Sequence, residues 1–422
     1  MKFKLIIVCL LGGAFLGSCS DENEGKYDGW YEGGEIPPMD ELSITAEEFG
    51  VKEGINKLGF EFANAIADNY DKVCGGDDDN FVFSPLSASF TLAMLANSCG
   101  DKMSNDIMAM NGCSDLSTFN IVNNKLLRYL SSNKSLNLYN SVWYSKYFCK
   151  LNKDYPKQMR QNYYADVNGV LFDDPETVKL MNAWVSDRTK GEISEFINET
   201  FPLDLVYIFN TLQFRATWFQ PFYEGETEPA EFFGTERNGN VDMMYKKETA
   251  SYTKTDRFEM IKTALTNYWD LSLILPAEGV EISDLSKYLS YDEWNKAVDQ
   301  LSLYTVKLFF PRFEVTNKLN LLPIYEHLGL WADENEGVTL DKLGKIQHNW
   351  MGPNKLTAFQ QTDFSVDENE VRLTAATAVN VLKGAGYYPE NEVTMRFDRP
   401  FMFVLTYHKL NSVIGIGRIC NL

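Results

Sequence analysis

The segment from Val366 to Gly386, VDENEVRLTAATAVNVLKGAG, constrains the fold most strongly because it combines two features that normally exclude each other. From Val371 to Leu382 almost every side chain is small, β-branched or apolar, as in a strand buried within a sheet. Acidic residues precede this run, and the loop-like sequence KGAGYYPEN follows it. The fold must therefore tolerate the same segment both in solvent and in a sheet interior.

Side chains of a strand alternate between two faces, so the segment can be tested for compatibility with a sheet interior. One face would carry no charge and consists of Val371, Leu373, Ala375, Thr377, Val379 and Val381. The only charge, Arg372, would lie on the other face with Thr374, Ala376, Ala378, Asn380 and Leu382. Twelve residues at ~3.3 Å each would form a long central strand of roughly 40 Å.

The composition indicates a folded globular protein with a strong negative charge. The chain has 422 residues, of which 45% are hydrophobic, enough for one large core or two ordinary ones. Its 39 basic and 59 acidic residues give a net charge of −20. Loss of residues 1–18, which hold Lys2 and Lys4 and no acidic residue, would make this −22. Nucleic acid and anionic membrane surfaces are therefore excluded as partners.

The N-terminus has the layout of a secretory signal: two lysines, an apolar run from Leu5 to Phe15, then Leu16-Gly17-Ser18-Cys19. The run is too short to span a membrane. The last four residues resemble a bacterial lipobox, which implies a signal peptide at 1–18 and lipidation of Cys19; an ordinary signal peptide containing a cysteine is the alternative. The following SDENEG resembles the surface-export signal of Bacteroidetes lipoproteins. We expect an extracytoplasmic protein, lipid-anchored to the outer membrane at the cell surface.

The remaining cysteines show no CxxC pairing and are odd in number, so neither a zinc site nor a complete disulfide framework is predicted. They are Cys74, Cys99, Cys113, Cys149 and Cys420. Buried free thiols are the default for such residues. We expect a monomer.

Residues 19–44 are rich in glycine, proline and acidic residues and lack apolar periodicity, which predicts a lipidated N-terminus and flexible tether. A single domain is predicted at 45–422. It begins with an amphipathic helix from Thr45, and a short strand, a Ser-Pro turn and a second helix follow from Asn80. Strand-like runs such as VYIFNTLQF, DLSLILP, TVKLFFPRFEV and RPFMFVLTYH alternate irregularly with helical patterns such as LNLLPIYEHLGL. A large α+β domain fits this organisation best.

Motifs for catalysis are absent. The sequence contains no GxSxG, HExxH or GxxxxGK and no complete GxGxxG. Its three histidines, His327, His348 and His408, lie far apart and beside no other candidate ligand. The acidic stretches GGDDDN and DENEG lack the alternating ligand pattern of a calcium loop. We therefore predict no enzymatic activity, no metal and no cofactor.

Seven motifs, taken in order, resemble those of the serpin family from about residue 45 to the C-terminus. They are NFVFSPLSASFTLAML, FNTLQFRATWFQPF, VDMMY, LILPAEG, FFPRFEVTNKLNLLPIYEHLGL, DRPFMFVL and GIGRICNL. The chain departs from the family pattern at Arg215-Ala216, where Lys-Gly is usual, and at Leu422, where proline is usual. The resemblance implies an α+β serpin fold of three β-sheets and eight to nine helices, with an exposed reactive loop at about 368–395.

The resemblance also implies where the reactive loop enters the central sheet after cleavage. The hinge would comprise Glu368, Glu370, Val371, Leu373, Ala375 and Thr377, and the region where the sheet opens would comprise Ser84, Ser87, Asn210, Trp218 and Gln360. Glu370 stands where the family has glycine and is placed before the inserting part. Leu373 stands where the family has an inward alanine, and is expected to overfill its site at a cost of ~1 to 3 kcal/mol.

The implied function is suicide-substrate inhibition of serine proteases, with cysteine proteases as possible further targets: the inserting loop carries the acylated protease along and distorts its active site. The loop is about five residues longer than is common in the family, so the register of the reactive bond is open. Counting from the hinge places this bond near Gly384-Ala385. Lys383-Gly384 favours a trypsin-like target, whereas the alternatives Leu382, Tyr387 and Tyr388 would suit elastase- or chymotrypsin-like enzymes. A non-inhibitory serpin that acts as a binding module or decoy substrate is the alternative function.

Overall fold

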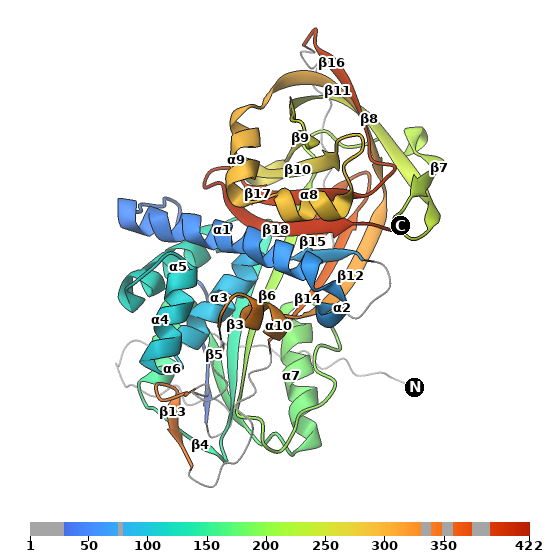
Figure 1. Cartoon of the computed structure of the whole chain (residues 1–422). Coiled ribbons are helices and arrows are strands. Elements are labelled where there is room, and N and C mark those ends of the chain that lie inside the picture. The colour runs from blue at the N-terminus through green and yellow to red at the C-terminus, as the bar shows by residue number, and fades with distance from the viewer. Residues whose placement is uncertain (1–28, 75–78, 331–338, 348–357, 374–388) are drawn as a thin grey trace, which may run out of the picture.

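The computed structural model describes residues 29–74, 79–330, 339–347, 358–373 and 389–422. These residues form an α+β fold of three sheets and ten α-helices (Figure 1). The predicted fold class and the predicted three sheets are confirmed. Ten helices compare with the eight to nine expected, and the shortest, α2 (Tyr70–Val73), has only four residues.

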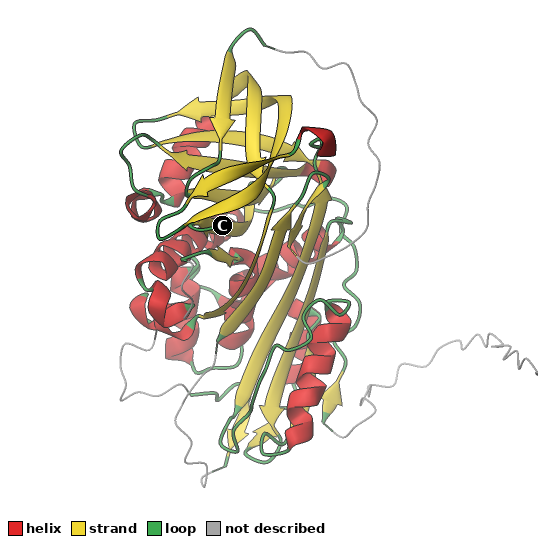
Figure 2. Ribbon diagram, turned by 90° about the vertical axis from the view of Figure 1, so that its right-hand side faces the viewer, coloured by secondary structure: helices red, strands yellow, loops and turns green. Residues whose placement is uncertain are grey.

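Sheet A contains seven strands with helices on both faces (Figure 2). Its strand order is β1 (Trp30–Tyr31), β5 (Asp166–Val170), β3 (Leu136–Ser145), β6 (Val206–Thr217), β15 (Glu370–Leu373), β14 (Phe359–Val366) and β12 (Phe313–Asn320). All neighbours are antiparallel except β3 and β5. Strands distant in sequence thus meet in its centre, where β15 contains Val371, the first residue of the small and apolar run.

Sheet B lies above sheet A in Figure 1, and sheet C is a pair of short antiparallel strands. The main path of sheet B is β16 (Glu392–Arg396), β11 (Ser302–Pro311), β8 (Asn238–Lys254), β9 (Phe258–Leu265), β10 (Trp269–Pro276), β17 (Phe401–Tyr407), β18 (Ser412–Ile419) and β2 (Phe81–Phe83). Beside this path, β7 (Glu228–Phe233) pairs with β8. Sheet C consists of β13 (Gly344–Ile346) and β4 (Cys149–Leu151).

The longest helix, α1 (Ala46–Asp68), begins where the sequence predicts, because Thr45 caps it and Glu48 completes a capping box. In α3 (Pro85–Ala96), the Ser84 side chain caps the first turn and Pro85 occupies the first helical position. The other helices are α4 (Asp101–Met110), α5 (Leu116–Ser131), α6 (Tyr155–Tyr163), α7 (Pro175–Arg188), α8 (Ile282–Tyr288), α9 (Tyr291–Asp299) and α10 (Leu322–His327).

The four strand-like runs named above form β6, β10, β11 with β12, and β17, which confirms these predictions. Every residue of β10 is buried, including Asp270 and Ser272, which interrupt its otherwise apolar sequence. The predicted helix in LNLLPIYEHLGL is shorter than its pattern, because Leu319 and Asn320 continue β12 and pair with Gln360 and Phe359. Sheet pairing therefore overrides the helical pattern at its start.

The N-terminal segment requires a correction, because residues 29–44 are bonded to the domain and not free as a tether. Trp30 and Tyr31 pair with β5, which adds a strand to the edge of sheet A. The Gly33 amide donates to the Asp166 carboxylate at 2.7 Å, and the Met39 amide donates to the Ser132 hydroxyl at 2.7 Å. The tether prediction was based on composition, and composition does not report that Trp30 and Tyr31 pair with a strand distant in sequence.

Two hydrophobic clusters hold the described residues together. The large one joins the inner face of sheet A to sheet B and most helices, and the small one lies between α7 and the outer face of sheet A, with Trp143, Val185, Phe196, Tyr207 and Phe209 among its members. The five cysteines Cys74, Cys99, Cys113, Cys149 and Cys420 are free thiols, as expected. No helix in the described part of the chain combines the length and the apolar character needed to cross a bilayer.

Candidate functional site

The centre of sheet A holds the short strand β15 between two longer strands. Strands β6 and β14 flank β15, and among the described residues no backbone pair joins β6 directly to β14. The two halves of the sheet are therefore connected at this point through β15, of which residues 371–373 pair with both neighbours. Beyond Leu373, β6 and β14 face each other with unpaired strand edges, and such edges can pair with a further strand. We call the region between residues 210–212 of β6 and 360–363 of β14 the slot.

The side chains of β15 alternate as predicted from the sequence. Val371 is fully buried, and Leu373 is 3% exposed and lies directly between Phe214 of β6 and Phe364 of β14. Arg372 lies on the opposite face, level with Arg215 and Ser365. Leu373 thus pairs with an aromatic residue on each side, and the cost of ~1 to 3 kcal/mol expected for a leucine at this position stays a prediction.

Glu370 belongs to the strand, in contrast to the expectation that it precedes the inserting part. It pairs with Thr217, and its side chain is 3% exposed. Nε and Nη2 of Arg215 each donate to its carboxylate at 2.6 Å, and Arg372 Nε also donates to it. Two arginines can satisfy this carboxylate, which is why a charged residue is tolerated where the family pattern has glycine.

The turn between β14 and β15 is fixed by a second buried carboxylate. Glu368 accepts hydrogen bonds from Arg312, with Nε at 3.2 Å, and from the Thr227 hydroxyl at 2.7 Å. Burial alone would raise the pKa of Glu368, but the bonds from Arg312 and Thr227 hold it below its usual range. Arg312 also contacts the exposed Asp242 at 3.2 Å.

Trp218 lies against this turn. Its Nε1 donates to the Asp367 carbonyl at 2.8 Å, and its backbone amide donates to the Asn369 carbonyl at 3.0 Å. Behind the indole, the ammonium of the fully buried Lys246 lies 4.5 Å from the ring centroid and 3.1 Å from Glu248. Burial lowers the pKa of Lys246 despite the nearby carboxylate. The hinge therefore rests on a rigid aromatic and charged support.

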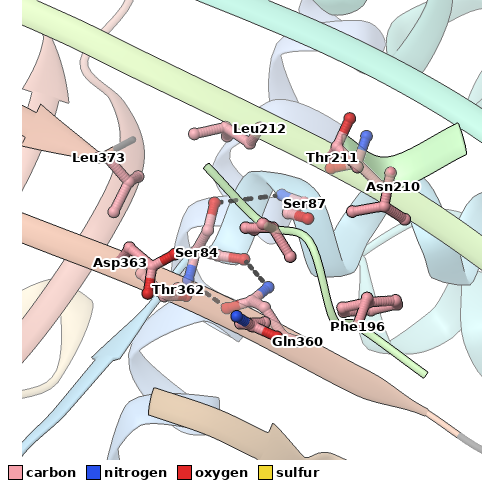
Figure 3. Close-up of a pocket in the computed structure, with 13 residues that line it drawn as sticks. Ser84, Ser87, Phe196, Asn210, Thr211, Leu212, Gln360, Thr362, Asp363 and Leu373 are labelled. Atoms are coloured by element: carbon pink, nitrogen blue, oxygen red, sulfur yellow. Dashed lines mark hydrogen bonds between the residues drawn. The ribbon is translucent and has the colours of Figure 1, made fainter. Parts of the chain in front are cut away.

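Below β15, the remaining sheet-opening residues meet around Ser84 (Figure 3). The Gln360 side chain accepts from the Ser84 amide at 2.7 Å and donates to the Ser84 carbonyl at 3.0 Å, while the Ser84 hydroxyl accepts from the Ser87 amide at 3.3 Å. Gln360 thereby ties β14 to the start of α3. Nδ2 of Asn210 donates to Asn140 at 2.7 Å, whereas its Oδ1 is buried and has no hydrogen-bond partner.

A cavity lies between the two sides of the slot. Its volume of about 30 Å³ is close to the space that one water molecule occupies. Its lining comes from α3, β6, β14, β15, the end of α7 and the segment after α7, and includes Ser84, Ser87, Ile193, Phe196, Asn210, Gln360, Asp363 and Leu373. Burial raises the pKa of Asp363. A strand could enter only if β6 and β14 moved apart and the α7 region shifted from the sheet.

The structure therefore brings together Ser84, Ser87, Asn210 and Gln360 below the slot, and Glu368, Glu370, Val371, Leu373 and Trp218 at its head. Ala375 and Thr377, the reactive-bond residues Leu382, Lys383, Gly384, Ala385, Tyr387 and Tyr388, and the lipidation residue Cys19 lie outside the described residues. Sequence reasoning missed the roles of Arg215 and Arg312 as counter-ions. The unusual pair Arg215-Ala216 was the one available signal.

The family model for serpins (serine protease inhibitors) matches residues 53–422. The chain belongs to the serpin family. Human Serpin B8 is 25% identical over 379 residues, which cover 82% of this chain and 95% of that protein. The native structure of tengpin, a thermophilic serpin, superposes with a TM-score of 0.76 at 23% identity and covers 92% of this chain and 97% of tengpin. This serpin thus has the fold that its motifs predicted, and its family acts on proteases without being enzymes.

The fold is also similar to that of a protein that binds thyroxine. Thyroxine-binding globulin in complex with thyroxine superposes with a TM-score of 0.73 at 20% identity, covering 87% of this chain and 98% of the globulin. At this identity the likeness shows the fold alone. The function of this serpin therefore has to be argued from its hinge and slot.

Proposed function

We propose that this serpin inhibits serine proteases by inserting its cleaved reactive loop into sheet A. The observation that carries the proposal is β15, which is paired on both sides and points into a slot whose two edges are otherwise unpaired in the described residues. Four residues of the segment occupy sheet A in the register that a longer strand would continue. The apolar sequence that follows Leu373 is suited to that interior.

The register of β15 assigns positions to the next residues. Leu373 lies between Phe214 and Phe364, so a continued strand would place Ala375 between Leu212 and Thr362. The same step would place Thr377 between Asn210 and Gln360, where its hydroxyl could donate to the unpaired Asn210 Oδ1. Small and β-branched side chains at these two positions match the narrow space between the strands.

The chemistry is acyl transfer to the protease. The protease serine attacks the carbonyl carbon of Lys383, the peptide bond to Gly384 breaks, and Gly384 leaves as a free amine while an ester joins Lys383 to the protease. Insertion then moves the attached enzyme before water can hydrolyse that ester. The basic Lys383 side chain suits the acidic specificity pocket of a trypsin-like protease.

We expect a trypsin-like protease to form a covalent complex with the protein that survives denaturing gel electrophoresis. Mass spectrometry of the released C-terminal peptide should show that it begins at Gly384. Elastase- and chymotrypsin-like enzymes tested in parallel should cleave at the other candidate bonds or form less complex. Fast cleavage by every class without any complex would reject inhibition and favour the decoy or binding-module alternative.

We also propose that Cys19 is lipidated and anchors the protein to the outer membrane. The lipobox-like Leu16-Gly17-Ser18-Cys19 supports this proposal. The wild-type protein should partition with membranes, and Cys19→Ala should leave the signal uncleaved or release the protein into the soluble fraction. A wild-type protein that is already soluble and begins at another residue would contradict lipidation.

A further inference from the structure

Two arginines face each other directly in sheet A. Arg372 of β15 and Arg215 of β6 are cross-strand partners on the same face, and their side chains are only 32% and 18% exposed. Like charges in this arrangement repel each other and destabilise the strand pair. A negative charge is therefore needed near Arg215 and Arg372 when β15 is part of sheet A.

Glu370 supplies this counter-charge from within the inserted strand. Its carboxylate is held by both Arg215 contacts at 2.6 Å and by Arg372, while Arg372 Nη2 lies 3.5 Å from Asp367. The residues level with this cluster, Thr217 on β6 and Ser365 on β14, are neutral. The carboxylate thus joins the first residue of the inserting strand to the strand beside it.

The same contacts persist when the strand lengthens. Because residues 371–373 already pair with both neighbours and Glu370 pairs with β6, further residues can be added below Leu373 without a change of register above it. The Glu370 bonds therefore do not oppose further insertion, and they stabilise the inserted hinge relative to a hinge that is fully expelled. The first pairs of the inserting strand are thus already formed in the uncleaved chain.

We propose that Glu370 is a positioning residue for loop insertion, which keeps the hinge seated in sheet A and thereby shortens the time between acylation and trapping. This role rests on the proposed inhibitory function. A seated hinge favours trapping over hydrolysis of the acyl link, so Glu370 acts on the partition between inhibitor and substrate behaviour. Glu370, which stands where the family has glycine, thus has a specific role in this chain.

The test compares the wild type with Glu370→Gln, which keeps the size of the side chain and removes its charge. In the intact protein, hydrogen exchange of the β15 amides should become about 10- to 100-fold faster, the factor for losing a charge-assisted hydrogen bond. With a trypsin-like protease, several molecules of the variant should be cleaved for each complex formed. Glu61→Gln, which removes an exposed carboxylate on α1, outside the reactive loop and the hinge, should change neither measurement.

A double variant, Glu370→Gln with Arg372→Gln, separates this role from general damage to the fold. It removes one of the two facing positive charges, so it should recover much of the slow exchange and of the complex yield. Unchanged exchange in Glu370→Gln, or no recovery in the double variant, would overturn the role of Glu370. Absence of any protease complex with the wild type would reject inhibition alone, because hydrogen exchange reports on hinge seating without a protease.

Discussion

An Ala375→Asp variant is expected to be cleaved at the same bond as the wild type and to release the protease in active form. In a strand continued in the register of β15, residue 375 would lie on the inner face of sheet A, between Leu212 and Thr362. A carboxylate there would be buried without a partner, at a cost of several kcal/mol. Insertion would then be too slow to outrun hydrolysis of the acyl link. The stoichiometry of inhibition and the covalent complex on denaturing gels measure the change.

Asn369→Asp is the matched control, because it adds the same charge at an exposed position of the same segment. It should inhibit like the wild type. The cleaved wild type and the control should also unfold at a higher temperature than the uncleaved proteins, since the loop has joined the sheet, whereas cleaved Ala375→Asp should not. Equal inhibition by Ala375→Asp and the control would show that residue 375 does not enter the inner face.

The alternation of the hinge could be predicted from the sequence because it depends on the two-residue period of a strand. Val371 and Leu373 do face the core, and Arg372 does lie on the opposite face. The motifs predicted the fold for a similar reason: buried strands such as β10 are mostly apolar, and the serine cap with proline at the start of α3 marks a helix directly.

Partners from distant parts of the chain could not be predicted in this way. The position of Glu370 depends on Arg215, 155 residues earlier, and that of Glu368 depends on Arg312 and Thr227. Likewise, Trp30 in the predicted tether pairs with Asn168 of β5, which is distant in sequence. Local periodicity reports on which face of an element is buried, whereas the counter-ions and added strands depend on tertiary contacts.

Removal of Arg312 is expected to destabilise the protein far more than removal of its partner Glu368. Arg312→Ala would leave the Glu368 carboxylate, whose side chain is only 4% exposed, buried without its cation, at a cost of ~3–5 kcal/mol. Glu368→Ala would leave an arginine that is 43% exposed and still 3.2 Å from Asp242, so a loss of only ~1–2 kcal/mol is expected. Urea unfolding followed by tryptophan fluorescence measures both.

The difference should depend on pH with a defined sign. The pKa of Glu368 is held below its usual range, so the stability that its ionised form contributes is present above the ordinary glutamate pKa of ~4.3 and is lost as the pH falls through the lowered value. In Arg312→Ala, burial would favour the protonated carboxyl, so the stability gap between this variant and the wild type should narrow in acid. Asp242→Asn, which removes the exposed partner of Arg312, should cost at most ~1 kcal/mol. If Arg312→Ala and Glu368→Ala were equally destabilising at neutral pH, the cost would come from losing the pair and not from the buried charge that remains.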